Sequence, residues 1–252
     1  MLLRIEDHDR QRSRPVFDTA LLEDLAWLGF EADEGPVRQT DGDAIAADEA
    51  ALGSLAARGL VYPCDCSRTT FAAWAREHGR AWSGPGCPGG CRDRALPGDA
   101  GTSLRVALGA GTESFDDIRL GPQTSDVSSA GDLVVRDREA NWTYGFAVVV
   151  DDLRQDIDLV VRGEDLLPET ARQIRLGRLL GRPSPPRFLH HPLIHKASGA
   201  KLSKSDQDSG VRDLRAAGWP AIRVRGEAAR RAAVPAAIVT ASLDPGDPPP
   251  GD

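Results

Sequence analysis

The stretch Leu159–Ile194, LVVRGEDLLPETARQIRLGRLLGRPSPPRFLHHPLI, decides the fold class. Its apolar start, Leu159–Arg162, predicts a short strand. Glu169–Leu180 predicts a helix that ends at Gly181, and Phe188–Ile194 predicts a second strand. Strands that alternate with helices are typical of a parallel α/β sheet.

The rest of the chain continues this alternation. Apolar residues recur at helical spacing before Gly29 and again before Gly59, and each glycine is suited to end a helix. The stretch Trp142–Val150 is apolar throughout and fits either a strand or a helix. Four further short strands are expected at residues 2–5, 60–62, 103–108 and 133–136.

Composition limits the class of protein. The chain has 252 residues and a net charge of -7, which suits one large α/β domain or a domain with an insertion. Charge is uneven: residues 1–50 hold thirteen acids against five Arg, whereas Ala171–His190 holds five Arg and no acid. That basic segment is either a phosphate-binding face or an ordinary solvated helix face.

No apolar run approaches the roughly 20 residues of a membrane span. The start is too short and acidic for a secretory signal, so we predict a cytoplasmic protein.

The four cysteines form two close pairs, and they predict a metal site. Cys64 and Cys66 are followed about twenty residues later by Cys87 and Cys91, within a stretch rich in Gly and Pro. Zinc takes four thiolates tetrahedrally, and such a closed site is structural rather than catalytic. A segment that buries little apolar surface needs such a staple. The alternative is four unrelated cysteines.

Two adjacent histidines, His190 and His191, follow one another in a predicted strand. No third ligand pattern accompanies them, so we interpret them as strand residues rather than metal ligands.

Lysine is confined to one short segment. The chain has 31 basic residues, and its three lysines are Lys196, Lys201 and Lys204. In the sequence KLSKS at Lys201–Ser205, two lysines three apart on a Gly-containing loop are suited to contact a triphosphate and to stabilise charge that develops at phosphorus. The alternative is an exposed basic loop.

The KLSKS segment resembles the KMSKS signature of class I aminoacyl-tRNA synthetases. The opening LRIEDHDRQRSRP at Leu3–Pro15, DEGPVRQTD at Asp33–Asp41 and WTYGFAVVVDDLRQDIDLVVRGEDL at Trp142–Leu166 resemble segments of the glutamyl subgroup, in the same order. The matches span most of residues 1–206. The resemblance implies a Rossmann-like parallel sheet with a zinc-containing insertion.

Within the subgroup, the chain is most similar to the short paralogues that attach glutamate to the queuosine base at the wobble position of tRNA-Asp. The cysteine pairs resemble the zinc insertion of these paralogues, many of which have tyrosine at the position of Cys87. Full glutamyl-tRNA synthetases continue into an anticodon-binding region, whereas this chain ends soon after the lysine loop.

The resemblance implies roles for individual residues. Glu6 would hold the α-amino group of glutamate, and Tyr144 and Arg162 would bind the same substrate. Lys201 and Lys204 would act in catalysis, with Lys204 contacting ATP, and Mg²⁺ would accompany the ATP. The glutamate carboxylate would attack the α-phosphate to give glutamyl-adenylate and pyrophosphate, and the glutamyl group would then pass to the tRNA.

Each glutamate-binding role has a structural alternative. Glu6 could be a surface acid in a charged loop. Tyr144 could be a core aromatic residue with a satisfied hydroxyl. Arg162 could pair structurally with Glu164 or Asp165.

The family places a His-Ile-Gly-His-like signature ahead of the Arg-Ile-Glu-Asp segment, whereas here Met1 is followed directly by a strand. We therefore expect the first strand and helix of the catalytic fold to be missing. A start site assigned too late is the preferred explanation. Without this segment, the adenylation site would lack half of its wall, and the remaining strands would expose a sheet edge.

We expect four regions and a monomer: the first part of the catalytic domain, the zinc insertion, the rest of the catalytic domain and a short C-terminal region with a disordered Pro-rich tail (residues 1–60, 61–105, 106–208 and 209–252). Two rival functions remain. One is a fragment of a glutamyl-tRNA synthetase that charges tRNA-Glu, and the other is a catalytically dead, zinc-stabilised RNA-binding paralogue.

Overall fold

The computed structural model describes residues 1–8, 13–79, 86–98, 101–195 and 210–232. Its strands are β1 (Leu2–Ile5), β2 (Glu34–Arg38), β3 (Val61–Cys64), β4 (Ser103–Val106), β5 (Thr112–Asp117), β6 (Gly121–Asp126), β7 (Leu133–Arg136), β8 (Leu159–Gly163) and β9 (Arg187–His191). Its α-helices are α1 (Pro15–Trp27), α2 (Gly42–Ala57), α3 (Arg68–His78), α4 (Tyr144–Arg154), α5 (Thr170–Leu179), α6 (Val211–Ala216) and α7 (Ala221–Arg231). Two short 3₁₀ helices span Val127–Ala130 and Glu164–Glu169.

The strands form three sheets, and the predicted strand–helix–strand unit lies in the largest. β8 and β9 are parallel neighbours on either side of α5 in sequence, with Val160 opposite Phe188. β5 continues this sheet in parallel to β9, and β6 is added antiparallel, so the order is β6-β5-β9-β8. β1 and β2 form a separate parallel pair. The third sheet, β3-β4-β7, is wholly antiparallel, a departure from an all-parallel arrangement.

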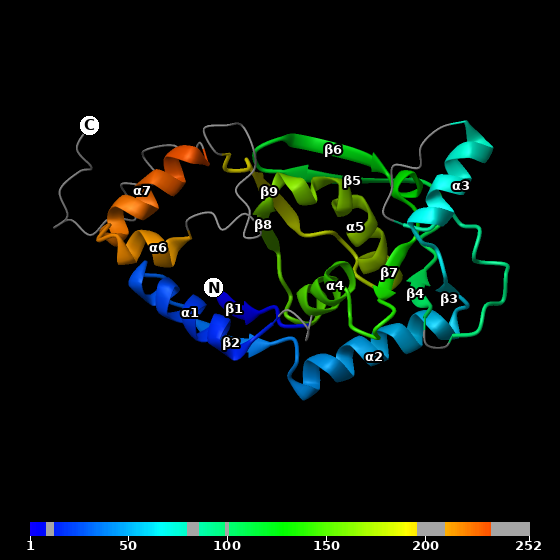
Figure 1. Ribbon diagram of the computed structural model, residues 1–252, viewed down its shortest axis with the longest axis horizontal. Coiled ribbons are helices and arrows are strands. Elements are labelled where there is room, and N and C mark those ends of the chain that lie inside the picture. The colour runs from blue at the N-terminus through cyan, green and yellow to red at the C-terminus, as the bar shows by residue number, and fades with distance from the viewer. Residues whose placement is uncertain (9–12, 80–85, 99–100, 196–209, 233–252) are drawn as a thin grey trace.

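The core is built around α4. Its residues Phe146–Val150 are all buried and contact side chains from α2, α5, β4 and β7. A helix buried on every side shows no polar face, so the apolar run at 142–150 carried no period that could separate strand from helix. Figure 1 shows α4 in the middle of the molecule, with α2 beneath it.

Several helices and strands of the structure were not predicted from the sequence. α3 follows the first cysteine pair, and it begins at a capping box in which Ser67 and Thr70 each cap the other's backbone N–H. The β5–β6 hairpin lies between the expected strands at 103–108 and 133–136, and α6 and α7 lie in the C-terminal region.

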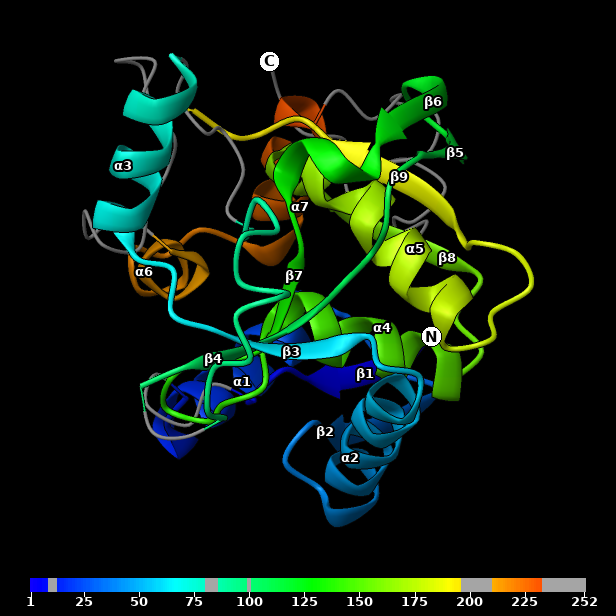
Figure 2. The same cartoon turned by 90° about the vertical axis from the view of Figure 1, so that its right-hand side faces the viewer.

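The two ends of the molecule carry different accessory elements. Figure 1 places α1, β1 and β2 beside α6 and α7 at one end, and α3 at the other. Arg212 and Arg215 of α6 pair with Glu23 and Asp24 of α1, at 3.3 and 3.7 Å. Figure 2, a side view, shows α3 standing apart from the central sheets.

In the part of the chain that the structure describes, no helix has the length and apolar character needed to span a membrane.

Candidate functional site

A cleft of about 340 Å³ separates strand β1 from strand β8. Each of these strands lies at the end of its sheet, so the cleft is bounded by two sheet edges and floored by α4. Glu6, Tyr144 and Arg162, which sequence analysis singled out from three separate segments, all lie on its wall. The full lining is Leu2, Leu3, Arg4, Glu6, Tyr144, Val148, Asp152, Ile157, Leu159, Val160, Val161 and Arg162.

Glu6 follows the end of β1, and its carboxylate remains accessible. Its side chain is 38% exposed and accepts a hydrogen bond from Arg4 at 3.3 Å. Arg4 itself is held by Asp152 at 3.0 Å and by Gln155 at 2.7 Å. Glu6 therefore keeps a free side for a cationic group while Arg4 fixes its position.

Tyr144 is the first residue of α4 and is partly buried against the core. Burial raises the pKa of Tyr144, and the negative charge of Glu6 adds to this, whereas Arg162 acts in the opposite direction. The hydroxyl therefore stays protonated at neutral pH and can donate a hydrogen bond in the cleft. Tyr144 lines the same cleft as Glu6 and Arg162, and both of their charges influence its pKa.

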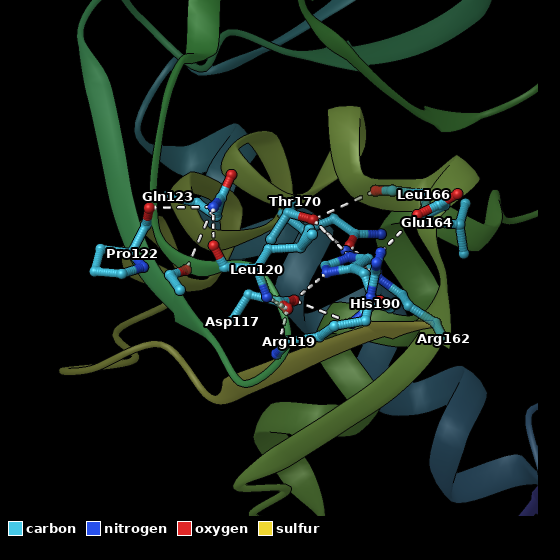
Figure 3. Close-up of polar contacts among 12 residues, drawn as sticks. Asp117, Arg119, Leu120, Pro122, Gln123, Arg162, Glu164, Leu166, Thr170 and His190 are labelled. Atoms are coloured by element: carbon cyan, nitrogen blue, oxygen red, sulfur yellow. Dashed lines mark hydrogen bonds and ion pairs between the residues drawn. The ribbon is translucent and has the colours of Figure 1, made fainter. Parts of the chain in front are cut away.

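Arg162 is a buried cation held by three neutral acceptors, as Figure 3 shows in part. Its guanidinium donates to His190 Nε2 at 3.1 Å, to Gln173 Oε1 at 2.6 Å and to Thr170 Oγ1 at 2.7 Å. Burial lowers the pKa of Arg162, but a guanidinium remains charged in proteins.

The buried charge of Arg162 makes the cleft suited to an anion. Among the described residues, no carboxylate forms an ion pair with Arg162; Glu164, one of its expected partners, pairs instead with Arg119 at 2.6 Å. A buried charge is costly unless it has a partner of opposite sign. A ligand carboxylate in the cleft would supply that partner through a bidentate contact.

The four cysteines converge on one point, as their spacing predicted. Their Sγ atoms all lie within 4.8 Å of one another, and Cys66 Sγ is 3.6 Å from Cys87 and 3.5 Å from Cys91. Zinc–sulfur bonds of about 2.3 Å in a tetrahedron place sulfur atoms about 3.8 Å apart, so the cluster fits the ion. The four residues are free cysteines, consistent with a structural zinc site.

The ionisation of the thiols also fits a metal site. Hydrogen bonds from Cys64 and Cys66 lower the pKa of the Cys87 thiol, whereas burial raises the pKa of Cys91 to about 11. The pKa of Cys66 is raised because it serves as a donor to its neighbours. A divalent cation at the centre of the cluster would stabilise all four thiolates.

Two ion pairs lie beside the cysteine cluster. Arg94 holds Asp65 with two hydrogen bonds of 2.8 and 2.9 Å. Asp132, which pairs with Cys87 in an antiparallel bridge, accepts from Tyr62 at 2.6 Å and from Arg92 at 2.6 and 2.7 Å. These contacts attach the Gly-rich segment to β3 and to the body of the molecule.

Some predicted residues have a clear place and others do not. His190 and His191 are strand residues of β9, as the sequence indicated. Lys201 and Lys204 lie outside the described residues. Sequence reasoning missed Asp117, Thr170 and Gln173, because a residue that orients a ligand-binding side chain leaves no local motif. The four-region division stays a prediction.

Comparison with known proteins gives the family. Residues 1–238 match the family model described as tRNA synthetases class I (E and Q), catalytic domain. The chain is 42% identical over 233 residues to a glutamyl-Q tRNA(Asp) synthetase of Symbiobacterium thermophilum, covering 86% of this chain and 71% of that protein. It is 37% identical over 240 residues to one of Nitratidesulfovibrio vulgaris, covering 90% and 74%.

A solved structure supports the fold. The glutamate tRNA ligase of Elizabethkingia meningosepticum, in complex with its amino acid, superposes with a TM-score of 0.65 at 25% identity. The match covers 82% of this chain and 45% of that enzyme, so the chain spans just under half of its length.

These matches define a class I aminoacyl-tRNA synthetase-like ligase with the glutamyl and glutaminyl catalytic fold. Within that class, the chain belongs to the glutamyl-Q tRNA(Asp) synthetase family.

Proposed function

We propose that the chain activates glutamate with ATP and transfers the glutamyl group to the queuosine base of tRNA-Asp. The relatives named glutamyl-Q tRNA(Asp) synthetase support the acceptor. The assignment of glutamate as the amino acid rests on the cleft, which is lined by Glu6, Tyr144 and the uncompensated cation Arg162. The Glu6 carboxylate and the Arg162 guanidinium, on opposite walls, complement an amino acid that carries an ammonium group and two carboxylates.

In this function, each side chain has a separate task. Glu6 accepts hydrogen bonds from the α-ammonium group, and Arg162 forms a bidentate contact to a carboxylate. Tyr144 donates a hydrogen bond from its hydroxyl group to the same ligand. Held in this way, the α-carboxylate attacks the α-phosphate of ATP, pyrophosphate leaves, and a hydroxyl of the queuosine base then displaces AMP from the adenylate. Positioning of this kind is what accelerates such transfers.

ATP with Mg²⁺ and the lysine loop complete the proposal. Lys201 and Lys204 stay predictions: they would stabilise the charge that develops at the α-phosphate. We expect Lys204→Ala to lower the rate of glutamate activation more than the affinity for glutamate. The zinc would hold the insertion in shape and take no part in the chemistry. A monomeric state and a cytoplasmic location also stay predictions.

The test measures the two half-reactions separately. Exchange of labelled pyrophosphate into ATP should require glutamate, should occur without tRNA, and should not occur with aspartate or glutamine. Labelled glutamate should then attach to tRNA-Asp that bears queuosine, and not to the same tRNA with guanine at the wobble position.

Two results would redirect the assignment. Attachment of glutamate to the 3′ end of tRNA-Glu would identify a glutamyl-tRNA synthetase catalytic unit, which the fold similarity to the Elizabethkingia enzyme makes the second candidate. Absence of pyrophosphate exchange, with tRNA binding retained, would identify an inactive RNA-binding paralogue.

A further inference from the structure

Asp117 and His190 form a fully buried pair behind Arg162 (Figure 3). Asp117 ends β5 and His190 lies in β9, and their Oδ2 and Nδ1 atoms are 2.6 Å apart. The same carboxylate accepts the backbone N–H groups of His190, Arg119 and Leu120 at 2.8 to 3.0 Å. Burial opposes ionisation of Asp117, but these hydrogen bonds outweigh it and lower its pKa. A carboxylate accepts only, so His190 Nδ1 carries the proton.

The other ring nitrogen of His190 is then an acceptor. Burial lowers the pKa of His190, and the nearby cations Arg162 and Arg119 also oppose its protonation, whereas Asp117 favours it. The imidazole is therefore neutral, with its lone pair on Nε2. Arg162 Nε lies 3.1 Å from that atom and donates to it. The opposite tautomer would place two N–H groups against each other.

Two residues from α5, Gln173 and Thr170, also accept hydrogen bonds from Arg162. Together with His190 they form a set of three acceptors that we call the cradle. Gln173 accepts from Nη1 of Arg162, and Thr170 accepts from Nη2. These contacts use three of the five guanidinium N–H groups and fix the plane of the side chain. The remaining N–H groups lie toward the cleft, where the Tyr144 hydroxyl also forms a hydrogen bond with Arg162 that raises its pKa, and where a ligand can be bound.

The cradle holds Arg162 without cancelling its charge. Histidine, glutamine and threonine are all neutral acceptors, and the negative charge of Asp117 is one imidazole ring away. A carboxylate in direct contact with Arg162 would fix the guanidinium equally well, but it would compete with the carboxylate of the substrate. The neutral cradle orients the cation and keeps it available.

We propose that His190 is a positioning residue for glutamate binding, which acts by presenting the Arg162 guanidinium to the cleft in an orientation that Asp117 sets through the imidazole tautomer. This inference rests on the proposed function, in which Arg162 binds glutamate. It adds two buried residues to the site, neither of which contacts the substrate.

The test compares two substitutions that fill the same space. His190→Gln can retain an acceptor near the position of Nε2, whereas His190→Phe retains the ring and loses the acceptor. In glutamate-dependent pyrophosphate exchange, we expect His190→Phe to raise the KM for glutamate about tenfold, the loss of one hydrogen bond to a charged group. We expect the KM for ATP to be unchanged, and His190→Gln to remain within about threefold of the wild type.

Two kinetic outcomes would overturn the inference. One is an equal rise in KM for both substrates, which indicates a general structural defect. The other is a glutamate KM that is unchanged in His190→Phe, or raised as much in His190→Gln.

A spectroscopic measurement decides the matter independently of activity. The chain has five histidines, so the signal of His190 in ¹⁵N-histidine-labelled wild-type protein can be assigned by its loss in His190→Gln. We expect a neutral ring with the proton on Nδ1; a proton on Nε2 would overturn the inference even if His190→Phe could not be purified. A wild-type protein that shows this tautomer but does not activate glutamate would refute the proposed function alone.

Discussion

Arg4 of β1 donates to Asp152 of α4 across 3.0 Å, and this contact connects the two-stranded sheet to the central helix. The preceding acid, Asp151, accepts from Gln39 at 2.9 Å, just beyond the end of β2. Two consecutive acids on one helix therefore bind both strands of the β1–β2 pair. This attachment holds Glu6, at the end of β1, opposite Arg162 on β8.

Removing Asp152 should destabilise the protein substantially. Arg4 and Asp152 have side chains only 14% and 11% exposed, so Asp152→Ala would leave a buried cation without its main partner. We expect a loss of about 3 kcal/mol in the free energy of unfolding, measured by urea denaturation. The exposed cluster in which Glu227 contacts Arg230 and Arg231 is the control, and Glu227→Ala should cost under about 0.5 kcal/mol. Equal losses would show that burial does not decide the contribution.

Zinc should bind with one ion per chain, and the cysteine cluster should depend on it. We expect Cys91→Ser to lose the metal and to lower the melting temperature, because a segment that buries little apolar surface depends on the bound metal for its stability. Elemental analysis and cobalt substitution, which gives the visible spectrum of a tetrahedral thiolate site, are the measurements. Asp65→Asn changes a neighbour that accepts from Arg94 and does not supply a thiolate, so it should retain the ion. Equal zinc content in both variants would refute the assignment.

The two tyrosines of the chain offer a matched pair for the glutamate site. We expect Tyr144→Phe to raise the KM for glutamate about fivefold, since one neutral hydrogen bond contributes about 1 kcal/mol. Tyr62→Phe removes the hydroxyl that donates to Asp132 beside the cysteine cluster, and we expect it to lower stability without changing that KM. The same effect of both substitutions on glutamate affinity would place Tyr144 outside the binding site.

The sequence predicted the parts of the fold whose signals are local. The strand–helix–strand unit at Leu159–Ile194 and the cysteine spacing are both read within a few residues, and both were confirmed. The β5–β6 hairpin was missed for a physical reason. The buried positions of β5 are Glu113, Phe115 and Asp117, so two of its three inward-facing residues are acids and the apolar alternation of a strand is absent.

The partners that make those acids tolerable come from far along the chain. Glu113 is neutralised by Arg175 and Arg178 of α5, and Asp117 by His190 of β9 and by backbone N–H groups. The candidate site follows the same pattern. Motifs located Glu6, Tyr144 and Arg162, but the cradle of Arg162 depends on side chains brought together only by the fold.

Asp48 should make the stability of the protein fall as the pH rises. It lies on α2 with 3% of its surface exposed, and burial, together with the nearby charge of Asp151, raises its pKa to about 7. In the unfolded chain an aspartate ionises near pH 4. Between about pH 4 and 7 the folded state thus binds more protons than the unfolded state, so its free energy of unfolding decreases over this range and then levels off.

Asp48→Asn removes this titration, because the amide carries no charge at any pH. We expect the variant to be more stable than the wild type by on the order of 4 kcal/mol at pH 8, and the difference to disappear near pH 4. Urea unfolding at a series of pH values measures it. Asp43→Asn, on the same helix, is the control with the opposite sign: Arg154 lowers the pKa of Asp43, so that substitution should weaken the protein at neutral pH and not stabilise it. A pH-independent difference between Asp48→Asn and wild type would mean that Asp48 is already ionised in the folded state at pH 5, and that water or a cation reaches it there.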